Sequence, residues 1–292
     1  MKTIKVILFF LITKVCFCQN LHLTEMLTYN TIRISTEIAT GTGFFFNFKV
    51  KNDSLSKMHI PTIITNRHVI NGANKIFLYF RKSINGQPEN GSAFVVEIHN
   101  TVKNVIAHPN PKIDLVAIPI ASIINQLAIN GVVPFTVGFT EKEVPSDEFQ
   151  KKEFKAFEEI YMIGYPRGLW DEINNMPIVR EGITATSPYL DYNGSREFLI
   201  DIAAFGGFSG SPVFMYNNSG YSDKSGGINV GGSRLYLLGV LYSGPQYSIN
   251  GTVTKSQPGS QADKTESQIP MNLGYVIKAS EILAFEALLN GR

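Results

Sequence analysis

Short apolar runs separated by glycine, asparagine and proline recur along most of the chain. Runs of this length that are rich in β-branched and aromatic residues predict β-strands. The predicted strands are Thr40–Val50, Ile60–Thr65, Lys75–Phe80, Ala93–Ile98, Asp114–Ile120, Ile160–Gly164, Gly182–Thr186, Phe198–Ile202, Ser211–Met215, Tyr236–Tyr242 and Leu273–Ile277. Only Ala279–Leu289, with apolar residues at helical spacing near the end of the chain, predicts a helix that closes the fold.

The distribution of these strands predicts an all-β protein built from two β-barrels. Residues 140–159 are rich in Glu and Lys and predict a charged, partly helical linker between a first barrel at 19–139 and a second at 160–292. Asn217–Arg234 and Gln246–Pro270 are polar and predict long loops. The second loop could be a lid, a contact for large substrates, or a disordered surface insertion.

Residues 1–18 have the pattern of an export signal. Lys2 and Lys5 precede the apolar run Val6–Ile12, and cleavage before Gln19 fits the small residues that follow. This apolar run is too short to span a bilayer, and no later run reaches 18 apolar residues. We therefore expect a periplasmic or secreted protein without a membrane span.

Composition narrows the class of partner. The 292 residues include 26 Lys and Arg against 24 Asp and Glu, and three of the lysines lie in the leader, so no basic excess favours nucleic acid. Both cysteines, Cys16 and Cys18, also lie in the leader, and an exported protein without disulfides is more typical of bacteria. No histidine spacing predicts a metal site, no motif predicts a cofactor, and nothing indicates the oligomeric state.

The strongest local motif is Gly206–Pro212, which reads GGFSGSP. Glycines allow a tight turn that exposes the hydroxyl of Ser209 and lets backbone N–H groups converge on one point, as an oxyanion hole requires. A glycine-rich hairpin turn is the plainer interpretation of the same residues.

Two further motifs supply what a serine nucleophile needs. His68 directly follows an apolar strand, and Asp114 begins another one. Each could be an ordinary turn residue, but a serine hydroxyl needs a base and a histidine base needs an acid to fix its tautomer. The chain order His, Asp, Ser is the one found in double-barrel serine peptidases, and here the base and acid fall on the first barrel and the serine on the second.

The chain resembles the chymotrypsin-like (trypsin-like) serine peptidases of bacteria, and in particular the protease domain of the high-temperature-requirement proteases, which implies the two-barrel chymotrypsin-like fold. The resemblance covers Gly41 to Ile282 and is carried by Gly41–Phe44, Thr65–Val69, Asp114–Ile118, Ile163–Gly168, Gly182–Ile183, Asp201–Ala204, Gly207–Pro212 and Gly274–Ile277. It implies a serine endopeptidase acting on polypeptides. Ser209 would be the nucleophile, His68 the base and Asp114 its orienting acid. The N–H groups of Gly207 and Ser209 would form the oxyanion hole.

The same resemblance implies a specificity pocket. Ala203 and Ala204 would lie near its floor, and the segment Tyr242, Ser243 and Gly244 would form one wall and pair with an extended substrate. Because no acid occupies the floor position, we expect cleavage after small or medium apolar residues and not after Arg or Lys. Asp201 lies two residues before that position.

The chain departs from the family pattern in three features, and two rival functions compete with the peptidase. Phe208 stands where digestive members carry an aspartate that pairs with a new N-terminus, the chain has no Ile-Val-Gly-Gly start, and no PDZ-like module follows the second barrel. We therefore expect no activation by N-terminal clipping.

The main rival is a catalytically silent binding protein on the same fold. An acyl hydrolase of the α/β type is disfavoured by the chain order and by the scarcity of helical patterns.

Overall fold

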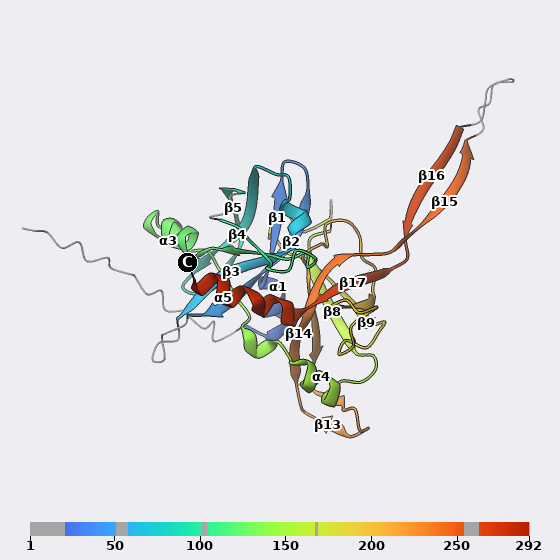
Figure 1. Cartoon of the computed structure of the whole chain (residues 1–292). Coiled ribbons are helices and arrows are strands. Elements are labelled where there is room, and N and C mark those ends of the chain that lie inside the picture. The colour runs from blue at the N-terminus through green and yellow to red at the C-terminus, as the bar shows by residue number, and fades with distance from the viewer. Residues whose placement is uncertain (1–20, 51–57, 101–103, 167–168, 254–262, 292) are drawn as a thin grey trace, which may run out of the picture.

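The computed structural model describes residues 21–50, 58–100, 104–166, 169–253 and 263–291, and the predicted leader lies outside these ranges. Two bodies of β-structure lie against each other, and a long two-stranded arm projects away from both (Figure 1). The predicted all-β architecture with a C-terminal helix is confirmed, as a closed six-stranded barrel beside a seven-stranded sheet.

The first half of the chain forms a seven-stranded antiparallel sheet in the order β5-β4-β1-β2-β3-β7-β6. Its strands are β1 (Thr31–Thr36), β2 (Thr40–Lys49), β3 (His59–Thr65), β4 (Lys75–Ile84), β5 (Gln87–His99), β6 (Ile106–Ala107) and β7 (Val116–Pro119). Side chains alternate along a strand, so Ile32 and Ile34 of β1 enter the same core together with Ile76 and Leu78 of β4.

The second half closes into a six-stranded barrel in the order β10-β17-β14-β11-β8-β9. Its strands are β8 (Glu159–Gly164), β9 (Ile178–Thr184), β10 (Glu197–Asp201), β11 (Pro212–Asn217), β14 (Arg234–Ser243) and β17 (Leu273–Lys278). A shared apolar core joins the halves, because Phe44 and Phe46 of β2 pack in one cluster with Phe214 and Leu237 of the barrel. This shared core fixes the two halves around the site that lies between them.

Short helices cover the ends of the sheets. They are α1 (Leu23–Tyr29), α2 (Arg67–Ile70), α3 (Ala121–Ile129), the 3-10 turn η1 (Glu141–Glu143), α4 (Asp147–Glu153), and at the C-terminus η2 (Ala279–Ala284) followed by α5 (Phe285–Asn290). The predicted linker thus contains η1 and α4, and α4 begins where the Ser146 side chain accepts from the Phe149 N–H. In the part of the chain that the structure describes, no helix is both long and apolar enough to cross a membrane.

The two polar segments are not the featureless loops that the sequence predicted. Asn217–Arg234 contains a small hairpin, β12 (Gly220–Ser222) with β13 (Ile228–Val230). Gln246–Pro270 contains β15 (Gln246–Val253) and β16 (Asp263–Pro270), which pair over eight positions. Regular backbone pairing satisfies the N–H and C=O groups of a polar segment as well as of an apolar one, so the low apolar content misled the prediction.

Candidate active site

His68 and Asp114 meet at the edge of the first sheet. The buried strand β3 ends at Thr65, Asn66 follows, and His68 lies in the first turn of α2. The Nδ1 atom of His68 lies 2.5 Å from Asp114 Oδ2, and the His68 backbone N–H donates to Asp114 Oδ1 at 3.1 Å. Both carboxylate oxygens thus hold the same residue. A neutral ring held this way carries its proton on Nδ1 and leaves Nε2 free to accept one.

The backbone around Asp114 is fixed as well. The Nδ2 atom of Asn66, which is fully buried, donates to the Asp114 carbonyl at 2.9 Å. Within the preceding loop, the His108 N–H donates to Leu115 O at 3.1 Å, and the buried His108 ring lies 3.1 Å from Glu281 O of η2. The loop that carries Asp114 is therefore held against the C-terminal segment of the chain.

The serine loop is held from both halves of the molecule. Gly207 and Gly210 have φ angles of +95° and +86°, a region that favours glycine. The Gly210 N–H donates to Leu241 O of β14 at 2.8 Å, and the Thr42 N–H of β2 donates to Ser209 O at 2.8 Å. A Cβ at Gly210 would lie only 1.9 Å from Thr42 O. The loop thus follows β2 so closely that only glycine fits there.

Thr42 connects the loop to a second strand. Its fully buried hydroxyl donates to Gly207 O at 3.0 Å and accepts from the Tyr165 N–H at 2.9 Å. Phe208, directly before the serine, is also fully buried and packs in the core of the second barrel. A buried aspartate at this position would need a cationic partner, whereas the apolar Phe208 ring needs none and adds packing to the hydrogen bonds that hold the loop.

Two backbone N–H groups of the serine loop are available to a ligand. The Phe208 N–H donates to Phe205 O at 3.2 Å, whereas those of Gly207 and Ser209 donate to no other described residue. Backbone N–H groups without an internal partner, close to a serine hydroxyl, are the kind of donor that an oxyanion hole requires.

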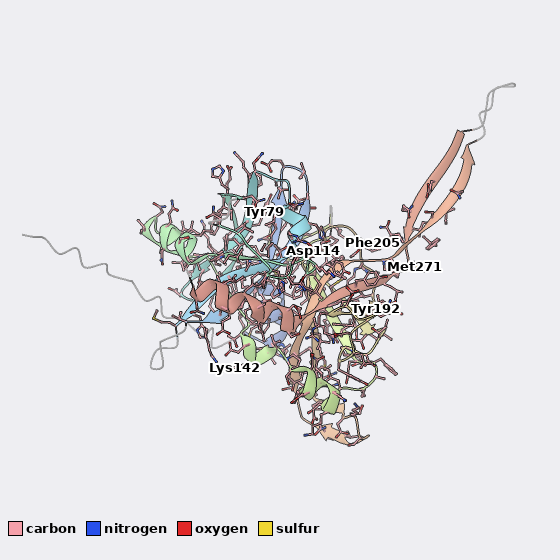
Figure 2. The ribbon with its side chains drawn as sticks, viewed as in Figure 1. Tyr79, Asp114, Lys142, Tyr192, Phe205 and Met271 are labelled. Carbon is pink, nitrogen blue, oxygen red and sulfur yellow. The ribbon has the colours of Figure 1, made fainter. Side chains whose placement is uncertain are left out.

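The structure brings the serine loop and the histidine segment together at Gly41. A Cβ at Gly41 would lie 2.6 Å from Cγ1 of Val69, the neighbour of His68, and 3.2 Å from Ser209 O. The Ser209 hydroxyl donates to Tyr242 O over a long 3.5 Å. Among the described residues, no hydrogen bond joins Ser209 Oγ to the His68 ring. Figure 2 shows Asp114 near the centre of the molecule, where the two halves meet.

The predicted pocket residues lie in the second barrel. Ala203 and Ala204 are half-buried and follow β10, and Asp201, at the end of that strand, is exposed. Ser243 and Gly244 extend β14 beyond its last pair with β11, which is Pro212 with Val240.

Tyr242, on the predicted wall of the pocket, is fixed by its own contacts. Its hydroxyl donates to Glu197 Oε2 at 2.6 Å. Burial and the Glu197 carboxylate raise the pKa of Tyr242 above its usual value, and the Asp114 carboxylate contributes in the same direction. This phenol is neutral at physiological pH and tied to the barrel.

The comparison with protein families identifies the family of this chain. A sequence profile described as the trypsin-like peptidase domain matches residues 41–220. The chain therefore belongs to the trypsin-like peptidase family. No curated protein sequence matches it significantly.

Structural comparison finds similarity to solved structures of proteases and of other proteins. They include the inactive form of Rv3671c from M. tuberculosis (14% identity over 92% of this chain and 89% of that chain, TM-score 0.41). The MamO protease domain from Magnetospirillum magneticum matches with 12% identity over 89% of this chain and 97% of that chain, and a TM-score of 0.40. The human heparin binding protein matches with 9% identity over 91% and 92%, and a TM-score of 0.45.

Proposed function

We propose that this peptidase is a serine endopeptidase in which Ser209, His68 and Asp114 act together. The observation that carries the proposal is the double contact of the Asp114 carboxylate with the ring and the backbone N–H of His68. It leaves Nε2 as the accepting nitrogen of a half-exposed ring. The serine loop, which lies beside the His68 segment at Gly41 of β2, supplies the nucleophile.

The proposed reaction follows from these positions. Nε2 of His68 takes the proton of Ser209 Oγ as this oxygen attacks the scissile carbonyl, and the Gly207 and Ser209 N–H groups bind the resulting oxyanion. The imidazolium, stabilised by Asp114, gives its proton to the leaving amine, which departs and leaves an acyl-enzyme. Water then attacks the ester with His68 again as base, which restores the serine and releases the acid.

Substrate preference and location are part of the proposal. Alanines at 203 and 204 offer no charge at the pocket floor, and exposed Asp201 is engaged by its backbone in the β10–β17 pairing. We propose cleavage after small or medium apolar residues. A peptide library in which cleavage follows Arg or Lys would refute this preference. We also propose export through residues 1–18, tested by whether their removal keeps the protein in the bacterial cytoplasm.

A fluorophosphonate probe tests the catalytic proposal directly. The probe should label the wild-type protein and leave Ser209→Ala unlabelled, because only an activated serine attacks it. The bond from Ser209 Oγ to Tyr242 O favours one second candidate, a binding protein whose serine is not engaged by the base. Failure to label a folded wild-type protein, together with retained binding of an unfolded polypeptide, would select this candidate.

A further inference from the structure

The arm formed by β15 and β16 continues the strands that border the proposed substrate cleft. β14 passes through Gly244 and Pro245 into β15, and β16 passes through Met271 and Asn272 into β17. The Met271 N–H donates to Pro245 O at 3.0 Å, so a hydrogen bond joins the two connections between the barrel and the arm, which is a separate two-stranded sheet. Figure 1 shows the arm reaching far beyond both halves, and Figure 2 shows Met271 at its base.

One face of the arm is apolar and open to solvent. Tyr247 pairs with Ile269 and Ile249 with Ser267, and Met271 lies opposite Pro245. Cross-strand partners and residues two apart share a face of a ribbon, so these side chains lie together. The exposed fractions of Tyr247, Ile249 and Met271 are 46%, 44% and 50%. Nothing in the described part of the chain covers this row.

The opposite face of the arm is polar. Ser248 pairs with Gln268 and Asn250 with Glu266, and all four residues are exposed. The Gln268 side chain donates to Ser248 Oγ at 2.7 Å across the ribbon. The arm is therefore amphipathic, although it packs on no core of its own, and this pattern indicates a partner for the apolar face.

A free strand edge runs from the nucleophile along the arm. On one side, β14 pairs with β11 up to Val240, and its Leu241 carbonyl accepts from the Gly210 N–H. Past that point no described strand occupies this side. On the other side, β14 stays paired with β17 through Ser243, and β15 stays paired with β16, which leads into β17. The unpaired edge therefore continues from Tyr242 through β15.

We propose that this edge and the apolar face of the arm bind an extended polypeptide on the N-terminal side of the bond to be cleaved. The inference rests on the proposed endopeptidase function. A substrate strand that takes the place of β11 and runs antiparallel to β14, as β11 and β17 do, approaches Ser209 from the arm. Its N-terminal part then pairs along β15.

The register of such a strand defines the substrate. Counting outward one residue at a time from Tyr242, Gln246 faces about the fifth substrate residue before the scissile bond, and Tyr247 to Ile249 face about the sixth to eighth. Apolar side chains at alternate positions would cover Tyr247 and Ile249. The site thus selects unfolded chains with a long apolar segment before the cleaved bond, in preference to short peptides.

The test compares two peptides built around one site that the enzyme cleaves in casein. Both extend equally on the C-terminal side, but one has four residues and the other ten before the scissile bond. In the double variant Tyr247→Ser and Ile249→Ser, the ratio of kcat/KM for the long peptide to that for the short one should fall about tenfold, equivalent to about 1.4 kcal/mol. The control Ser248→Ala with Asn250→Ala changes the polar face and should keep the ratio.

Three results would overturn the proposal. The first is that the wild type cleaves the two peptides with equal kcat/KM. The second is that the two double variants change the ratio of kcat/KM values equally. The third is that the wild type sediments as an oligomer and the apolar-face variant as a monomer. The last would assign the apolar face to a second copy of this chain.

Failure of the catalytic proposal can be distinguished by binding. Without fluorophosphonate labelling or casein cleavage, fluorescent casein is titrated into the Ser209→Ala protein. Weaker binding on adding the apolar-face changes would still support the arm, and unchanged binding would refute it.

Discussion

The hydroxyl of Thr42 offers a sharp test of how the serine loop is held. Replacing Thr42 by valine keeps the shape of the side chain and removes only the oxygen that bonds Gly207 O and the Tyr165 N–H. Both partners are buried, so the change leaves one acceptor and one donor without a bond and without access to water.

The magnitude follows from these two groups. A buried polar group left unpaired costs about 1–3 kcal/mol, so two of them should lower the free energy of unfolding by about 2–6 kcal/mol. The loss also frees the peptide group after Gly207, beside the proposed oxyanion hole. Labelling by a fluorophosphonate should therefore slow at least about tenfold even where the variant is fully folded.

Urea unfolding and labelling kinetics measure the two effects separately. Thr62→Val is the matched control, because Thr62 is equally buried in the same sheet but its hydroxyl donates only to Ile60 O, two residues away. We expect a loss of about 1 kcal/mol and an unchanged labelling rate for the control. Equal losses of stability in the two variants, with labelling at the wild-type rate in both, would refute the reasoning.

Three further predictions concern the same region. Asp114→Asn should leave the fold intact but slow fluorophosphonate labelling by about 10³–10⁴-fold, because an amide can hold the histidine in the wrong tautomer; labelling at the wild-type rate would exclude Asp114 from the triad. Gly210→Ala should destabilise the protein by about 3 kcal/mol or more in urea, because its Cβ would meet Thr42 O at 1.9 Å, while Gly206→Ala, with nothing within 4 Å, should not. The raised pKa of Tyr242 means that the unfolded state ionises first, so the free energy of unfolding should fall as pH rises above about 10, and Tyr242→Phe should reduce this fall. An identical pH profile for the Tyr242→Phe variant would contradict that assignment.

The strands that build the core were predictable because burial on both faces leaves a continuous apolar run. The predicted strands Ile60–Thr65 and Tyr236–Tyr242 are of this kind. The observed strands, His59–Thr65 and Arg234–Ser243, are only slightly longer. By contrast α3 was missed although Ile123, Ile124 and Leu127 recur at helical spacing, because the run is short and none of its residues is fully buried. The arm was missed because its pairing is between backbones of largely polar segments.

The candidate site divides in the same way. Ser209, His68 and Asp114 lie in local motifs, and the sequence predicts their roles, which stay predictions until they are tested. The support from Thr42 could not be predicted, because its hydroxyl bonds partners 165 and 123 residues away in the chain. The glycine-threonine-glycine run at 41–43 was a signal of family resemblance, but nothing local to it shows which oxygen it would bond.

The placement of the two halves of the site on separate bodies of β-structure has a consequence for how the protein is made. A nascent chain completes the histidine and aspartate part first and the serine loop more than ninety residues later. On the proposed mechanism neither half would hydrolyse a peptide efficiently alone, since a histidine base needs its nucleophile and a serine hydroxyl is a poor nucleophile without its base. The proposed mechanism therefore implies that newly made chains do not cleave one another while they are unfolded, and that proteolytic activity begins only when both halves have folded.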